Sequence, residues 1–123
     1  MINTKKLMKS FKYAFEGIHY ALYSDQNLVI HFMVGIVVVV VSILFQVNPF
    51  EMGILGLTIL LVIAAEMINS AIEQMVDLIT NEHRKEAKIA KDVSAGMVLL
   101  ISMGSVIIGI LIFGPYILRI FRS

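Results

Sequence analysis

Cysteine is absent from this sequence of 123 residues, so disulfide bonds and metal sites built from thiolates are excluded. Charge is scarce as well, since charged residues make up only 15% of the chain and hydrophobic residues 59%. A mean hydropathy of +0.88 is too high for a water-soluble domain of this size. The net charge is only +1, and no basic stripe with interleaved aromatic residues occurs, which argues against a nucleic acid partner. The composition therefore predicts one membrane domain, residues 1–123.

The first segment, residues 4–23, has the periodicity of an amphipathic helix. Its apolar residues recur at spacings of three and four, and lysines occupy the opposite face. A helix of this kind lies in the interface plane of an anionic leaflet. A helix packed on a soluble partner has the same pattern, but here a membrane-spanning candidate follows directly, so we expect the interfacial location.

Three later segments are long and apolar enough to cross a membrane as helices. The sequence predicts them over residues 28–47, 49–80 and 93–118. Between the first two, Asn48 suits a helix cap and Pro49 suits the first helical position. Glu51 comes three residues after the cap, as a capping box requires. The second helix is about 46 Å long, whereas the hydrocarbon layer is about 30 Å thick. The last third of that helix therefore leaves the membrane.

Two further features lie inside the spans. For His31 we expect a ring that points back toward the interface or bonds to a neighbouring helix, rather than a catalytic group. Ser105 and Gly109 form a pair of small residues one turn apart, which permits close helix approach in lipid. Because three spans leave few faces for internal packing, we expect self-association.

Basic residues gather at one end of the predicted bundle. Four lysines precede the first span and four cations precede the third, whereas the first connection has no lysine or arginine. Arg119 and Arg122 follow the third span, but two charges do not outweigh eight. By the positive-inside rule, the amino terminus and the charged segment 81–92 face the cytoplasm. The chain is therefore predicted to be a multi-pass protein of the cytoplasmic membrane.

Polar residues enter the second long helix near the end of its apolar stretch. At about 100° per residue they share one face, and they are Glu66, Asn69, Ser70, Glu73 and Asp77. Glu66 lies about 25 Å along the axis from Pro49, near the cytoplasmic edge of the hydrocarbon, and Glu73 lies about 10 Å further out. Carboxylates at a membrane boundary are costly and are a functional hypothesis by default. This polar stripe connects lipid depth to aqueous depth.

Phosphoryl transfer from a nucleotide to a lipid alcohol suits such a stripe. The reaction needs a base for the hydroxyl, acidic ligands for magnesium and cations for the phosphate charge. Glu66 would reach the hydroxyl and Glu73 would hold the metal, since magnesium takes one or two carboxylates besides phosphates and water. A polar stripe also suits a small oligomeric channel or proton-coupled transporter. A third possibility is a structural or regulatory subunit in which Glu66 pairs only with Lys91.

At these residues the sequence closely resembles the prokaryotic integral-membrane diacylglycerol kinase and undecaprenol kinase family. Two motifs carry the resemblance, ExxNSAIExxVD at residues 66–77 and AKDxSAG at residues 90–96. The three spans behind an amphipathic amino-terminal helix also match, so the resemblance covers nearly the whole chain. It implies an ATP- and magnesium-dependent lipid kinase that works as a homotrimer, with sites where helices of neighbouring protomers meet.

The resemblance also assigns roles to particular positions. Glu66 would be the catalytic base with Asn69 as its polar support, Glu73 would bind magnesium, and Lys91 with Asp92 would engage the nucleotide. Three positions where the family contacts the nucleotide have less well matched residue types, namely Glu82, His83 and Arg84. Tyr13 and Lys6 fall at ATP- and substrate-contact positions, and Lys6 replaces an arginine familiar in some members. Asp25 falls where the family has a second metal-binding glutamate, and its shorter side chain keeps the charge but loses reach.

The lipid substrate leaves few marks in the sequence, because diacylglycerol and undecaprenol both combine an apolar body with one hydroxyl. Tryptophan is absent, and residues 16–22 read EGIHYAL. This combination looks like the Gram-positive branch of the family, which favours undecaprenol, with diacylglycerol as the alternative.

Overall fold

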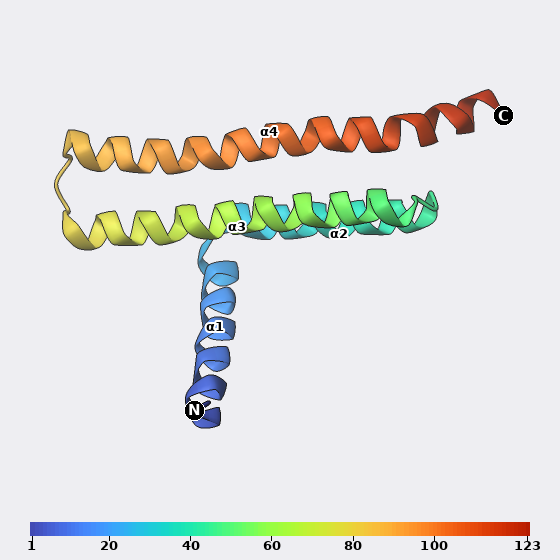
Figure 1. Cartoon of the computed structure of the whole chain (residues 1–123). Coiled ribbons are helices and arrows are strands. Elements are labelled where there is room, and N and C mark those ends of the chain that lie inside the picture. Colours follow the sequence, from blue (N-terminus) through green and yellow to red (C-terminus); the bar gives the residue numbers. More distant parts are fainter.

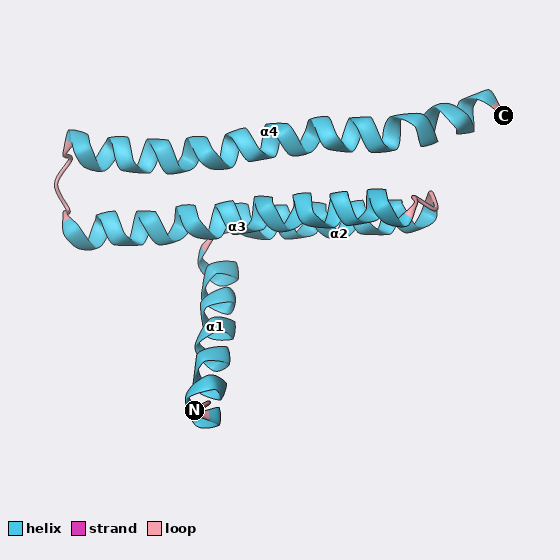
Figure 2. Cartoon of the chain, viewed as in Figure 1, coloured by secondary structure: helices cyan, strands magenta, loops and turns pink.

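The computed structural model describes all 123 residues and consists of helices without any strand (Figures 1 and 2). The four helices are α1 (Thr4–Ser24), α2 (Gln26–Leu44), α3 (Pro49–Ile79) and α4 (Lys85–Arg122). Helices α2, α3 and α4 are each long and apolar enough to cross a membrane. The predicted all-α architecture with three spanning helices is therefore confirmed, and the chain is a membrane protein.

Helix α3 is the centre of the arrangement, because it packs against both α2 and α4. Each of the three long helices runs antiparallel to the one before it, and α1 points away from them across their common direction (Figure 1). Apolar side chains of α1, including Leu7, Phe11 and Phe15, are exposed in the single chain. This geometry suits a helix that lies on a membrane surface while the other three cross it.

The connection between α2 and α3 is a short turn whose residues cap both helices. Helix α2 ends at Leu44, three residues before the predicted end, because the chain turns at Gln46, which has a left-handed φ of 54°. Helix α3 begins at Pro49 as predicted, and Asn48 Oδ1 accepts a hydrogen bond of 2.9 Å from the Glu51 N–H. The Glu51 carboxylate contacts the Asn48 side-chain amide rather than its backbone N–H.

Tyr116 of α4 joins the same turn from the side. The Tyr116 hydroxyl lies 3.3 Å from Glu51 Oε1 as donor and accepts a hydrogen bond of 3.2 Å from the Asn48 N–H. Polar contacts thus fix α4 to the start of α3 at this end of the bundle.

Helix α4 begins at Lys85, eight residues before the predicted third span. The part between Lys85 and Asp92 is charged, and it runs alongside the end of α3 that carries Asp77. Only residues 80–84 form the connection between the two helices. Most of the charged segment is therefore a helical extension and not a loop, which gives its side chains fixed positions.

Candidate active site

Glu66 is the only ionisable residue among the buried ones, with an exposed fraction of 2%. It lies on α3 and faces α2, where His31 Nε2 is 3.7 Å from Glu66 Oε2. Asp25 and Asn27, at the start of α2, are also close enough to act on the Glu66 carboxylate. The deepest carboxylate of the stripe is thus surrounded by polar groups that all come from one neighbouring element.

Asn69 lies one turn further along α3 and is held from the other side. The hydroxyl of Ser94 on α4 donates a hydrogen bond of 2.7 Å to Asn69 Oδ1, and both residues are buried. The Asn69 side-chain amide in turn donates to Glu73 Oε1 over 3.4 Å. Ser94 therefore determines which end of the Asn69 amide faces Glu73.

Asp25 connects the junction of α1 and α2 to the polar stripe. Its Oδ1 caps α2 by accepting hydrogen bonds from the N–H groups of Asn27, at 2.9 Å, and Leu28, at 3.3 Å. Its Oδ2 accepts a hydrogen bond from the hydroxyl of Ser70 on α3. Since Ser70 and Glu73 are three residues apart on one helix, their side chains are neighbours. Asp25 thus contacts the stripe one turn from Glu73, the other predicted metal ligand.

The donor atoms here are of the kind that magnesium prefers, namely carboxylate and amide oxygens. No group of three or more histidine or acidic side chains is close enough to hold a metal alone. Magnesium usually keeps several waters and binds through one or two carboxylates together with substrate phosphates. Asp25 and Glu73 therefore fit a magnesium ion that arrives with phosphate groups.

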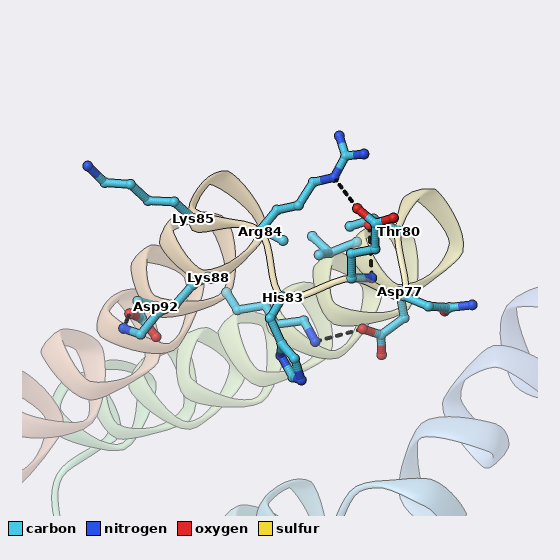
Figure 3. Close-up of a pocket in the computed structure, with 12 residues that line it drawn as sticks. Asp77, Thr80, His83, Arg84, Lys85, Lys88 and Asp92 are labelled. Carbon is cyan, nitrogen blue, oxygen red and sulfur yellow. Dashed lines mark hydrogen bonds and ion pairs between the residues drawn. The ribbon is translucent and has the colours of Figure 1, made fainter.

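A polar cleft of about 630 Å³ opens beside the stripe where α3 turns into α4 (Figure 3). It contains all five residues of this region that the sequence links to a nucleotide, Glu82, His83, Arg84, Lys91 and Asp92. Lys85, Lys88 and Asp77 also line it. Four cations thus face three carboxylates, which leaves a positive excess suited to phosphate.

Ion pairs hold most of these charges in place. Lys91 Nζ lies 2.6 Å from Asp77 Oδ1, Arg84 Nε lies 3.2 Å from Glu82 Oε2, and Lys88 pairs with Asp92. Lys91 precedes the apolar part of α4, and the hydrogen bond to Asp77 raises the pKa of its ammonium group. Lys85 has no carboxylate partner, and it extends with Arg84 to one side of the turn while His83 points to the other (Figure 3).

The pairing of Lys91 with Asp77 corrects one of the alternatives drawn from the sequence. A purely structural role for Glu66 required Glu66 to pair with Lys91. Lys91 instead contacts Asp77, eleven residues further along α3, and Glu66 faces His31. The ion pair that joins α3 to α4 therefore does not use the buried carboxylate.

Lys6 and Tyr13 are not brought to the cleft within one chain. Both are exposed on α1, which leads away from the bundle (Figure 1). Two other contacts were missed by the sequence analysis. The link between Ser94 and Asn69 had no signal beyond the position of Ser94 in a motif. For His31 the sequence left open a ring pointing toward the interface or a bond to a neighbouring helix, and it did not name Glu66.

Comparisons with a family model and with individual proteins point to the same family. The family model for prokaryotic diacylglycerol kinase matches residues 12–113. A diacylglycerol kinase of Synechocystis is 39% identical over 104 residues, which cover 84% of this chain but 59% of the relative. An undecaprenol kinase of Bacillus subtilis is 37% identical over 110 residues, which cover 89% of each chain.

Proposed function

The chain belongs to the prokaryotic diacylglycerol kinase family, and we propose that it is an ATP- and magnesium-dependent lipid kinase of the cytoplasmic membrane. It transfers the γ-phosphoryl group of ATP to the hydroxyl of a membrane lipid alcohol. The observation that carries this proposal is the continuity of one face of α3. That face begins at a carboxylate buried among apolar helices and ends at a charged cleft with an excess of cations.

Glu66 is the proposed base. The lipid oxygen forms a bond to the γ-phosphorus of ATP, the bond from this phosphorus to the bridging oxygen breaks, and ADP leaves. The hydroxyl proton passes to the Glu66 carboxylate, so atoms and charges balance. Asn69 supports the site as a polar neighbour, and its orientation is fixed by the hydrogen bond from Ser94.

Asp25 and Glu73 are the proposed magnesium ligands. When bound with the nucleotide, magnesium neutralises the charge that develops on the phosphate oxygens. Asp25 is preset for this position because its backbone begins α2 and its side chain is tied to Ser70. Glu73 is oriented by the amide of Asn69.

The polar cleft is the proposed nucleotide site, with contacts from Lys91, Asp92, Glu82, His83 and Arg84. Phosphate oxygens compete with the carboxylates that pair with these cations in the free protein, and charge-assisted bonds to phosphate are strong. Lys6 and Tyr13 complete the site from α1 of a neighbouring protomer in a homotrimer. This arrangement is supported by the direction of α1, which carries both residues away from the cleft of their own chain.

Undecaprenol is the proposed main substrate, and diacylglycerol is the second candidate. The relative named undecaprenol kinase aligns over 89% of both chains, whereas the chain spans 59% of the relative named diacylglycerol kinase. Alignment over most of both chains supports the undecaprenol kinase as the better guide.

A parallel assay tests the proposal. Purified protein in mixed micelles receives labelled ATP, magnesium and either undecaprenol or diacylglycerol, and lipid phosphate is extracted and counted. We expect transfer to both hydroxyls, with the higher kcat/KM for undecaprenol. A higher value for diacylglycerol would reverse the substrate order. No lipid phosphate, together with ion flux through protein-containing liposomes, would support a channel instead.

A further inference from the structure

His31 has no role in the proposed function, although it lies beside the proposed base. Its ring is 25% exposed, and its Nε2 faces the nearly inaccessible carboxylate of Glu66. His31 also lines an apolar cleft of about 220 Å³ between α2, α3 and α4. His31 thus lies near the proposed base and also lines this cleft.

The cleft has the character of a site for hydrocarbon. Its walls include Val34 and Val38 of α2, Val62 of α3 and Phe113 of α4. Since Val38 is seven residues from His31, the cleft follows the helices for about 10 Å from the ring. An apolar cleft with a few polar groups, here with His31 at one end, is the usual form of a site for an apolar ligand.

The backbone of α2 is closely packed one turn after His31. A Cβ atom on Gly35 would lie 2.9 Å from Ile59 Cγ2, so α2 and α3 approach one another closely there. Asp25 fixes the start of α2 through its bond to Ser70. With α2 held against α3 before and after His31, the backbone of His31 has a defined distance from Glu66.

We propose that His31 is a positioning residue, which orients the Glu66 carboxylate toward the acceptor hydroxyl while its ring holds the first apolar carbons of the lipid at the mouth of this cleft. The separation of 3.7 Å between His31 Nε2 and Glu66 Oε2 is beyond hydrogen-bond length. Contacts of this kind are often long without substrate and shorten in the reactive complex. This inference rests on the proposed function and adds a determinant of its rate.

The test uses two replacements of His31 in the full-length protein. His31→Leu keeps bulk and removes the nitrogen, and we expect kcat with the lipid alcohol to fall about 10- to 100-fold, because orientation of a reacting group is lost. The KM for ATP should stay within about twofold, since the nucleotide cleft is distant along α3. His31→Gln restores a side-chain N–H donor, and it should recover kcat to within about fivefold of the original protein. The matched control is His19→Leu on α1.

Three results would overturn the inference. A kcat for His31→Leu within twofold of the original protein is one, and a His31→Gln variant no better than His31→Leu is the second. The third is a KM for ATP that rises as steeply as kcat falls, which indicates general disruption. If His31→Leu does not fold, His31→Asn replaces it in the comparison with His31→Gln. The asparagine amide is one methylene shorter than that of glutamine. Failure of the original protein to phosphorylate any lipid alcohol would refute the proposed function itself.

Discussion

Replacing Ser94 by alanine removes the hydrogen bond of 2.7 Å that joins α4 to Asn69 of α3. Both residues are buried, with exposed fractions of 4% for Ser94 and 8% for Asn69, so water does not readily replace the lost donor. Side-chain hydrogen bonds between membrane helices contribute about 0.6 kcal/mol on average and about 1.7 kcal/mol at most. Because this acceptor is left buried and unpaired, we expect a loss of about 1 to 1.7 kcal/mol in the free energy of unfolding.

The same change should slow the reaction, because Asn69 loses the contact that directs its amide toward Glu73. If the activation free energy of the reaction rises by the same amount as the free energy of unfolding falls, kcat decreases roughly 5- to 20-fold. Unfolding of the purified protein by a denaturing detergent in mixed micelles measures the stability, and transfer of labelled phosphate to lipid measures kcat.

Ser42→Ala is the matched control, since Ser42 is also buried and its hydroxyl bonds to the Val38 carbonyl of its own helix. Its stability should change by less than about 0.5 kcal/mol. If Ser94→Ala leaves both stability and kcat unchanged, or if Ser42→Ala has effects of the same size, the hydrogen bond from Ser94 does not have this role.

Three further predictions concern the metal, the nucleotide and the far end of the bundle. Glu73→Gln should raise the magnesium concentration for half-maximal rate about tenfold or more, because a carboxylate ligand is lost; an unchanged magnesium titration contradicts the metal role. Lys91→Met should raise the KM for ATP about tenfold, because it removes a cation from the cleft. Lys5→Met on α1 is the control and should leave the KM for ATP unchanged. Equal effects of the two changes would refute a specific nucleotide contact of Lys91. Tyr116→Phe removes the hydroxyl that contacts both Glu51 and Asn48. It should lower the free energy of unfolding by about 1 kcal/mol relative to the control Tyr20→Phe. Equal stability of the two variants would mean that this contact does not stabilise the turn.

The fold follows from the sequence to a large extent, because its signals are local. Apolar length predicts three spanning helices, and the cap at Asn48 with Pro49 predicts the start of α3 to the residue. The end of α2 was misplaced by three residues, since the turn depends on a left-handed conformation at Gln46 that no residue type signals. The charged segment was harder still, because its helix is continuous with an apolar one and lacks a side-chain cap.

The candidate site was predicted as a set of residues but not as a set of contacts. Helical periodicity places Glu66, Asn69 and Glu73 on one face of a single helix. It does not determine which residues of the other helices meet that face, since this depends on helix rotation and crossing. The contacts of Ser94 and His31 with this face therefore emerged only from the packing of α4 and α2 against α3.

One comparison tests the proposed role of Glu66 as the base. Phosphate transfer from labelled ATP to undecaprenol is measured for the purified original protein and for Glu66→Gln under the same conditions. We expect lipid phosphate from the original protein and none above background from the folded variant. Full activity in Glu66→Gln would contradict the assignment of the base, and no transfer by either protein would contradict the lipid kinase itself.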